Sequence, residues 1–417
     1  MPHIKETTPG SSQTQGKPPL GIIEFVTLMA TMTSLVALSI DAMLPALMQI
    51  GAALNVQEEH QAHLIVTVFF VGMAFGQMFF GPFSDARGRR LTILIGLCIF
   101  VLGTIVCMLS TTLEMMLVGR VIQAFGVSGP RIASMAIIRD LYMGDAMARV
   151  MSFIMMVFIF VPMLAPMIGQ AVMNMSSWFH IFSLFLVVAV ASGIWFFSRQ
   201  GETLPRYKRR EFSFAQFFLS SKFILTHITV MGYTLAMGCI FGAFLAYLSA
   251  SQTIFQVYYG AGDNFPYIFA LLAFSIGIAS YFNSKMVMRF GMRKLCRFAL
   301  KGANGFAVVY LALLFAYDGL PPLALTVITM FIGFFFVGIL FGNLNAMAMH
   351  PLGEMAGLGA AIIGSLSSLF SVPVALFVDS FLNGNLYPIG TGFFIFFLLA
   401  YAAVMYAERV HDSGEQA

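Results

Sequence analysis

Charged residues are scarce in this sequence. Asp, Glu, Lys and Arg make up only 10% of the 417 residues, whereas 59% are apolar. Soluble domains carry about a quarter charged residues, so water is not expected to be the main solvent of a chain with a mean hydropathy of +0.89. Many apolar runs exceed the roughly 18 residues that suffice to cross a membrane. The composition indicates a lipid bilayer as partner, and it gives no indication of nucleic acid binding.

Cysteine and the usual signatures of enzymes are also scarce. The four cysteines, at positions 98, 107, 239 and 296, lie within or at the ends of apolar runs without paired spacing. We expect free thiols and no metal site. The sequence has no metal-binding His pair, nucleophile motif or nucleotide-binding loop. These absences argue against an enzyme, an ATP-driven pump and a bound cofactor.

Apolar runs separated by polar residues predict twelve membrane-spanning segments. Only helices and closed barrels satisfy backbone polar groups in lipid, and these runs lack the alternation of barrel strands. We therefore expect an all-α membrane protein of twelve transmembrane helices. The expected spans are 22–48, 62–83, 91–110, 114–138, 149–173, 178–198, 223–249, 265–287, 296–316, 321–348, 356–381 and 387–407.

The longest internal polar stretch divides the chain into two halves of six spans. The predicted organisation is a flexible tail at 1–20, a six-helix bundle at 21–198, a basic linker at 199–222, a second bundle at 223–408 and a tail at 409–417. A weak internal repeat supports this division: when Ser284 is aligned with Gly81, Gly291 falls on Gly88 and Arg293 on Arg90. Two pseudo-symmetric bundles are the expected result.

The basic residues predict the orientation of the chain. Of the 22 Lys and Arg residues, only Arg120 and Arg131 fall deep inside an expected span, and all the others fall in the tails, in the even-numbered loops or at the span ends that adjoin these loops. Cytoplasmic loops are enriched in Lys and Arg, so this distribution places both termini in the cytoplasm. A multi-pass protein of the cytoplasmic (inner) membrane is expected.

The loop after the second span carries a recognisable motif, "GPFSDARGRR". Gly81, Asp85, Gly88, Arg89 and Arg90 match the signature by which the major facilitator superfamily is known, and the chain resembles that family. The family's Arg after Asp is Ala86 here, with Arg87 one position later. The resemblance implies that these residues form a charge latch that favours one side of a transport cycle. A topology signal in a solvated loop is the alternative.

Three further motifs resemble one branch of that family. "GRVIQAFG" places Arg120 on the fourth-helix arginine of proton-driven antiporters, and "APMIGQ" resembles an exporter motif that includes Pro166 and Gly169, with Pro162 one turn earlier. "SIDAMLPAL" and "IIRDLY" resemble the bicyclomycin-resistance (Bcr/CflA) branch of drug/proton antiporters. The resemblance implies proton-coupled efflux of small, largely apolar organic compounds by alternating access, performed by a functional monomer, with protons as the coupling ion. The alternatives are an exporter of one endogenous metabolite, such as a siderophore or nucleoside, and a non-transporting membrane sensor.

Asp41 is the leading candidate for proton coupling. It lies some nineteen residues into the first span, where a carboxylate costs roughly 2.5 to 3.5 kcal/mol. It should therefore face a cavity, take a partner or bind a proton, unless it is an interfacial acid at the helix end. Arg120 is expected at a similar depth, so an interaction between the two is geometrically possible.

Polar residues within spans predict the rest of the substrate cavity. Arg131 follows Arg120 by about three helical turns, with Gln123 between them on one face. This polar stripe indicates a water-accessible pathway, although Arg131 snorkelling to the cytoplasmic interface is an alternative. The other expected cavity residues are Tyr233, Met237, Phe241, Asn343 and Asn345.

Overall fold

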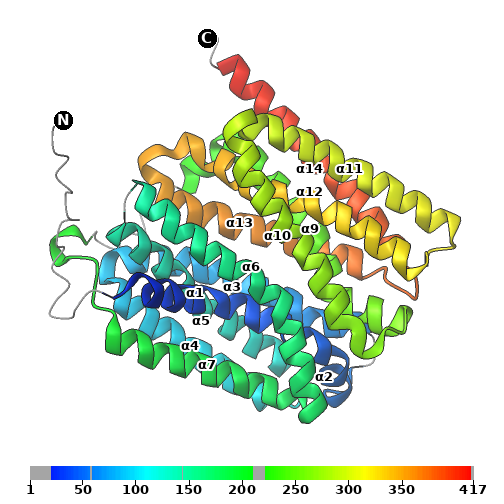
Figure 1. Ribbon diagram of the computed structural model, residues 1–417, viewed down its shortest axis with the longest axis horizontal. Coiled ribbons are helices and arrows are strands. Elements are labelled where there is room, and N and C mark those ends of the chain that lie inside the picture. Colours follow the sequence, from blue (N-terminus) through cyan, green and yellow to red (C-terminus); the bar gives the residue numbers. More distant parts are fainter. Residues whose placement is uncertain (1–19, 57–58, 143, 210–220, 415–417) are drawn as a thin grey trace, which may run out of the picture.

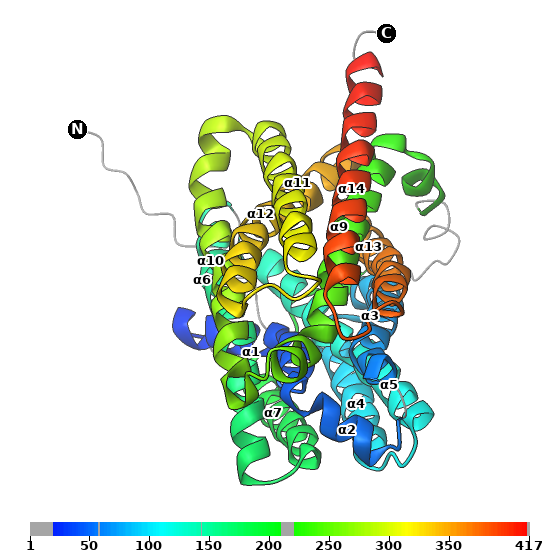
Figure 2. The same ribbon diagram turned by 90° about the vertical axis from the view of Figure 1, so that its right-hand side faces the viewer.

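The computed structural model describes residues 20–56, 59–142, 144–209 and 221–414 (Figures 1 and 2). Within these ranges the ordered elements are helices and no strand is present. Eleven helices are long and apolar enough to span a bilayer, and α6 adds the shorter apolar segment Phe160–Met175. The predicted all-α membrane fold is confirmed.

Six long helices form the first bundle, which we call the N-half. They are α1 (Ile22–Asp41), α3 (Glu59–Arg87), α4 (Arg89–Met108), α5 (Leu113–Leu141), α6 (Gly144–Met175) and α7 (Trp178–Arg199). The second bundle, the C-half, consists of α9 (Ile228–Gln252), α10 (Phe265–Phe290), α11 (Met292–Ala316), α12 (Leu323–Met349), α13 (Ala356–Asp379) and α14 (Tyr387–Gly414). Figure 1 shows the N-half below and the C-half above, with α13 and α9 next to the N-half.

Glycines allow α5 to occupy the middle of the N-half. A Cβ added at Gly72 of α3 would collide with the backbone of Val121, and one at Gly103 of α4 would collide with the backbone of Gln123. Both neighbouring helices therefore approach α5 more closely than a larger residue would permit. This packing buries the side chain of Arg120 completely.

Two helices differ from the expected uninterrupted spans. The first span was expected over 22–48, but α1 ends at Asp41 and is followed by a 3₁₀ turn, Leu44–Ala46, and a short helix α2, Leu47–Ala53. Pro45 lies inside the turn, and proline has no backbone N–H with which to continue the helix. At the end of α9, the chain continues as a π-helical segment, Thr253–Tyr258.

The chain termini and the linker are described only in part. Residues 1–19 of the expected first tail and residues 210–220 of the expected linker lie outside the described residues. The last helix, α14, continues to Gly414, beyond the expected end of the second bundle at residue 408. Near the start of this extension, the Glu408 carboxylate of α14 accepts a hydrogen bond from Arg297 of α11 at 2.6 Å, which joins the two helices.

The two ends of the bundle differ in how the halves are joined. We call the end that carries Arg87, Arg89 and Arg90 the basic end, and the end where α1 and α9 finish the closed end. Side-chain hydrogen bonds between described residues of the two halves lie at the closed end, apart from Ser365 Oγ to the Ala74 carbonyl at 2.8 Å. The halves are therefore bound together by polar contacts mainly at one end.

Candidate functional site

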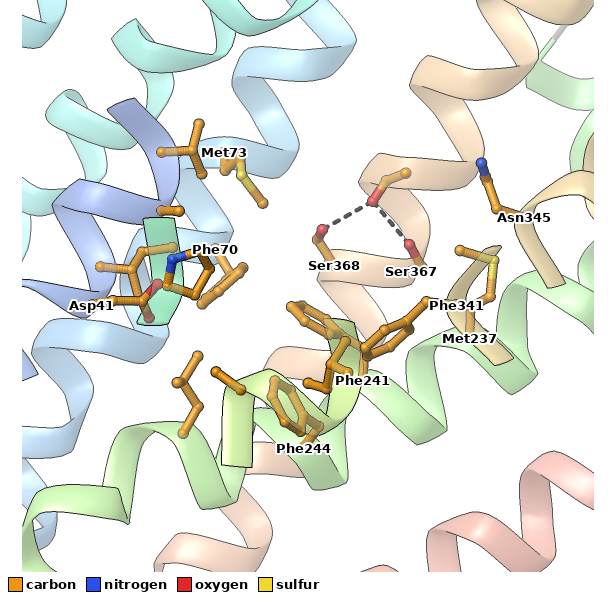
Figure 3. A pocket seen from close by; sticks show the side chains of 18 of the residues that line it. Asp41, Phe70, Met73, Met237, Phe241, Phe244, Phe341, Asn345, Ser367 and Ser368 are labelled. Carbon is orange, nitrogen blue, oxygen red and sulfur yellow. Dashed lines mark hydrogen bonds between the residues drawn. The ribbon is translucent and has the colours of Figure 1, made fainter. Parts of the chain in front are cut away.

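A cavity of about 650 Å³ lies between the two halves (Figure 3). Helices α1, α3, α5 and α6 line it from the N-half, and α9, α10, α12 and α13 line it from the C-half. At its closed end the lining side chains are buried, with Asp41 only 5% exposed and Tyr247 1% exposed. Asn345, nearer the basic end, is exposed. The cavity is thus blind at the closed end and accessible toward the basic end.

Among the described residues, Asp41 is the only acidic one that lines this cavity. Its carboxylate forms no hydrogen bond or ion pair within the described part of the chain. The hydroxyl of Tyr247 in the opposite half is also buried in the lining without a hydrogen-bond partner. Figure 3 shows Asp41 across the cavity from the aromatic side chains of the C-half. Asp41 therefore lies in the lining of the cavity, on the side of the N-half.

The proposed exporter motif lies directly against Asp41. Pro162 lines the cavity, and both Pro162 and Pro166 lie inside α6. One turn further, Gly169 lies so close to Ala42 that an added Cβ would overlap the Ala42 carbonyl oxygen. The glycine therefore permits α6 to reach the residue that follows Asp41, at the point where α1 stops being helical.

Arg120 and Gln123 were expected in the cavity, but the structure places them outside its lining. Arg120 is completely buried in the N-half, where it donates to the carbonyls of Ile65 and Ser39, both at 3.1 Å, and to the amide oxygen of Gln123. Its guanidinium also lies over the Phe69 ring, 4.4 Å from the centroid. These contacts replace the ion pair with Asp41 that the sequence allowed, and they hold the backbone two residues before Asp41.

Arg131 is the cationic residue of the cavity lining among the described residues. Its side chain lines the cavity and donates to the sulfur of Met73 at 3.3 Å. Arg131 forms no ion pair with any carboxylate in the described ranges. Among the described residues, the lining thus contains one carboxylate, at Asp41, and one guanidinium, at Arg131.

Aromatic and sulfur-containing side chains form the wall of the cavity. Phe241 of α9 packs edge-on against Phe70 of the N-half at 5.2 Å between ring centroids and against Phe341 of α12 at 5.8 Å. Phe244 continues this wall, and Met237 lines it as predicted. Apolar walls with adaptable Met side chains can hold compounds of different shapes.

Two expected cavity residues of the C-half lie elsewhere. Asn343 is buried within the C-half, where its amide donates to Asn283 at 2.6 Å and to the Ile339 carbonyl at 2.9 Å. Tyr233, one helical turn before Met237, lines a separate pocket nearer the basic end. Helical periodicity explains the first result, because Asn343 lies two positions before Asn345 and so faces another direction. Tyr233 shares a helix face with Met237 but lies one turn closer to the start of α9, beyond the central cavity. Asn345 does line the central cavity.

Several lining residues were not identified from the sequence. They are neutral side chains whose positions carry no unusual feature in an apolar helix, and they include Gln77, Ser367 and Ser368. For Ser367 and Ser368 a weak signal is present, because several serines lie close together within an otherwise apolar span. Their hydroxyls donate to the Gly364 carbonyl in α13.

A hydrogen-bonded group at the closed end was also missed. His63 of α3 contacts Asp379 of α13 through Nδ1 at 2.6 Å and Thr253 of α9 through Nε2 at 2.9 Å. All three residues are buried. Beside them, Gln252 donates to the Pro45 carbonyl at 2.6 Å and accepts from the Met48 backbone at 3.0 Å. We call these contacts the closed-end clasp, because each joins the N-half to the C-half.

The motif at the basic end is held within the N-half. Arg89 donates to Asp85 at 2.6 Å, to Ser84 at 2.9 Å and to Asp140 at 3.0 Å. Arg90 donates to the Phe197 carbonyl at 3.1 Å. Gly81 lies at the surface toward α13, where an added Cβ would contact Ala361 at 3.3 Å. In this conformation Arg89 and Asp85 therefore bind each other and not the C-half.

Two remaining motif positions fit a tight turn. Gly88 adopts a φ of 102°, in a region that other residues rarely enter. Arg87 is the last residue of α3. Among the described residues no group of three His, Cys, Asp or Glu side chains is placed to hold a metal ion.

Two bundles of membrane-spanning helices around a shared cavity that is closed at one end define a membrane transporter. Comparison with known proteins gives the family. Residues 20–375 match the family model of the Major Facilitator Superfamily, and the chain belongs to this family.

Its relatives include transporters with different names. An uncharacterized MFS-type transporter, YdgK, of Bacillus subtilis is 31% identical over 80% of this chain and 82% of its own length. A bicyclomycin resistance protein homolog of Haemophilus influenzae is 30% identical over 82% of this chain and 85% of its own. The multidrug resistance protein MdtL of Salmonella newport is 25% identical over 78% and 80%.

Solved structures of the same fold support this assignment. The partially occluded inward-open xylose transporter XylE from E. coli has a TM-score of 0.70 at 14% identity, covering 93% of this chain and 97% of its own. A peptide transporter, POT, in complex with sulfate has a TM-score of 0.75 at 13% identity, covering 96% and 97%. At these identities the likeness establishes the fold alone.

Proposed function

We propose that the protein exports small, largely apolar organic compounds across the cytoplasmic membrane in exchange for protons. The observation that carries this proposal is Asp41, a buried carboxylate without a partner among the described residues, at the blind end of a cavity whose walls are mainly apolar. The names of the bicyclomycin resistance and multidrug resistance relatives support efflux of drug-like compounds.

The orientation follows from the positive-inside rule. Lys and Arg collect in the loops of the basic end, so we assign this end and both termini to the cytoplasm. The conformation described here is then open toward the cytoplasm and closed toward the outside. It corresponds to the state that accepts a compound for export.

The transport cycle proceeds by alternating access. When the cavity faces outward, Asp41 takes up a proton as the compound leaves, because an ionised carboxylate without a cation is costly at membrane depth. When the cavity faces the cytoplasm, the compound binds and the proton is released there. Arg120 contributes indirectly, since it holds the Ser39 carbonyl and thereby the end of α1.

The test uses inverted membrane vesicles with an imposed pH gradient and a pH-sensitive dye. Antibiotics, dyes and anionic metabolites are added to native protein and to Asp41→Asn. We expect at least one compound to collapse the gradient with native protein and to leave it intact with the variant. Asp318→Asn is the matched control, because Asp318 lies in an exposed loop with a φ of 50°, which asparagine also tolerates.

Equal responses in native protein and Asp41→Asn would remove Asp41 as the proton carrier. Binding of the same compounds to both purified proteins would show whether the substitution affects coupling or recognition. If native protein binds a compound and moves it without moving protons, the proposed antiport is wrong and the transporter works by another mechanism.

A second candidate is export of one anionic metabolite. Arg131 favours it, because this guanidinium lies in the cavity lining and has no carboxylate partner among the described residues. An anionic compound would supply the missing negative charge. The anionic metabolites in the vesicle assay distinguish this candidate from a pump for apolar compounds.

A further inference from the structure

A second pocket, of about 340 Å³, lies in the C-half at the basic end. It is bounded by the start of α9, the turn from α10 to α11 and the end of α12. Figure 2 shows the turn between α10 and α11 at the top of the bundle, away from the N-half. The pocket is separate from the central cavity, since the two have no lining residue in common.

The polar lining of this pocket suits an anion. Arg293, Lys294 and His350 contribute nitrogen donors, and none of the described residues that line the pocket is acidic. Thr229 also lines it, is only 5% exposed, and its hydroxyl forms no hydrogen bond with the rest of the described chain. This hydroxyl is therefore a polar group that a ligand in the pocket can hydrogen-bond.

The internal repeat provides an independent argument. Gly291 begins α11 with φ 80° and ψ 154°, and Gly88 begins α4 with φ 102° and ψ 163°. The two glycines are equivalent in the repeat, and neither helix has a side-chain cap from its N-cap residue. The two halves therefore present the same helix start at their basic ends.

In the N-half an anion already occupies this position. The Glu202 carboxylate accepts from the backbone N–H of Arg89 at 3.0 Å and of Arg90 at 3.2 Å. A Cβ added at Gly88 would contact that carboxylate, whereas one added at Gly291 would meet no atom of the described residues within 4 Å. The start of α11 thus has space where the start of α4 has a carboxylate.

We propose that the C-half pocket binds an anionic phosphate group, in the position that Glu202 occupies in the N-half. The helix start and the cations of Arg293 and Lys294 attract the negative charge, and the Thr229 hydroxyl adds a hydrogen bond. An anionic phospholipid headgroup and a soluble phosphate share this chemistry. The proposal does not depend on the transported compound or on proton coupling.

Native mass spectrometry of the purified full chain tests the proposal. The protein is titrated with phosphatidylglycerol, with phosphatidylcholine as a lipid of no net charge, and with inorganic phosphate as competitor at constant ionic strength. We expect native protein to bind phosphatidylglycerol about tenfold more tightly than phosphatidylcholine, because both lipids carry an anionic phosphate but the choline cation of phosphatidylcholine is repelled by Arg293 and Lys294. If inorganic phosphate displaces phosphatidylglycerol, soluble anions share the site. If phosphatidylglycerol stays bound in the presence of phosphate, the lipid headgroup is the ligand.

Variants locate the binding to this pocket. Removing both cations with R293Q/K294Q is expected to weaken phosphatidylglycerol binding about tenfold, and Thr229→Val about threefold through loss of one hydrogen bond. The matched control, K285Q/R289Q, removes two cations from α10 outside the pocket and should change binding less than about twofold. Thr229→Val nearly preserves the shape of the side chain, so its result does not depend on a change in folding.

The proposal is overturned if phosphatidylglycerol and phosphatidylcholine bind native protein equally. It is also overturned if R293Q/K294Q and K285Q/R289Q reduce binding by the same factor, because the effect would then be one of general surface charge.

Discussion

Two arginines on the same helix have different roles at the residue scale. Arg120 is completely buried and bound to backbone carbonyls of α1 and α3, whereas Arg131 lines the cavity and contacts only a methionine sulfur. The first holds neighbouring helices together, and the second is available to a bound compound. Substitutions at the two positions should therefore be separable in experiment.

Arg120→Gln is expected to destabilise the protein. Glutamine cannot reach both the Ile65 and Ser39 carbonyls, and leaving buried polar groups unpaired costs about 1 to 3 kcal/mol each. Thermal unfolding in detergent should show a clear decrease in the midpoint relative to native protein. Arg139→Gln, at an exposed position of the same helix, serves as control. Equal midpoints for the two variants would contradict the assigned role.

Arg131→Gln is expected to leave the unfolding midpoint close to that of native protein. Its effect should appear in binding, where an anionic compound loses one charged hydrogen bond worth about 1.5 to 3 kcal/mol and a neutral compound loses little. Equilibrium binding of matched neutral and anionic compounds to the purified variant measures the difference. An equal loss of affinity for the neutral and the anionic compound would show that Arg131 does not recognise the charge of the compound.

Residues that are unusual in their surroundings could be found from the sequence. Asp41 and Arg131 are charges inside apolar spans, and the structure places both at the cavity. The partner of Arg120 could not be found in this way, because a backbone carbonyl such as that of Ser39 has no signature in the sequence. His63 and Asp379 were missed for a related reason: they are 316 positions apart, and only the packing of the two halves brings them together.

At the scale of elements, the close approach of α6 to the end of α1 requires a residue without a side chain at position 169. Gly169→Ala is expected to displace the backbone at Ala42 and with it Asp41, because the added methyl group overlaps the Ala42 carbonyl. Transport in vesicles should decrease at least tenfold, and the unfolding midpoint should fall. Gly305→Ala is the control, since a Cβ at Gly305 meets no atom within 4 Å. Full transport by Gly169→Ala would show that the contact tolerates adjustment.

The closed-end clasp joins elements that lie far apart in the chain. We expect His63→Gln and Asp379→Asn each to weaken the contact between α3 and α13 and to favour separation of the halves at that end, because a buried pair is disrupted. A cysteine introduced at Leu248, in a background without the native cysteines, reports the change through labelling by a membrane-impermeant maleimide. Labelling from the side of the closed end should increase several-fold.

Ser380→Ala is the matched control for this experiment. Ser380 is next to Asp379, but its hydroxyl bonds only within its own helix end, to the Phe377 carbonyl. If His63→Gln and Ser380→Ala label at the same rate, the clasp does not determine how the closed end opens.

For the whole molecule, the all-α membrane fold was predictable because apolar length alone identifies a membrane helix. The departures from regular α-helix were less predictable. Pro45 gave a local sign of the 3₁₀ turn after Asp41, but the π-helical segment Thr253–Tyr258 has no comparable residue. That segment is associated instead with the contacts that Gln252 and Thr253 make to the other half.

The proposed orientation of the whole molecule is tested by reporter fusions. Alkaline phosphatase, which is active only outside the cytoplasm, is expected to be inactive when fused after Gly414 at the end of α14. It should be active when fused after Gly262, in the loop between α9 and α10. Green fluorescent protein at the same positions should give the opposite result. The reverse pattern would invert the assignment of the basic end.

The one-sided opening of the cavity also imposes an order of encounters. A compound that enters from the basic end passes Asn345 and Arg131 before it can reach Asp41 at the blind end. In the proposed export cycle, the charge of the compound therefore meets Arg131 first and its shape meets the aromatic wall next, before the carboxylate is reached. Discrimination in that cycle would be a sequence of steps in time, and a rejected compound would leave on the side from which it entered, before the halves change conformation.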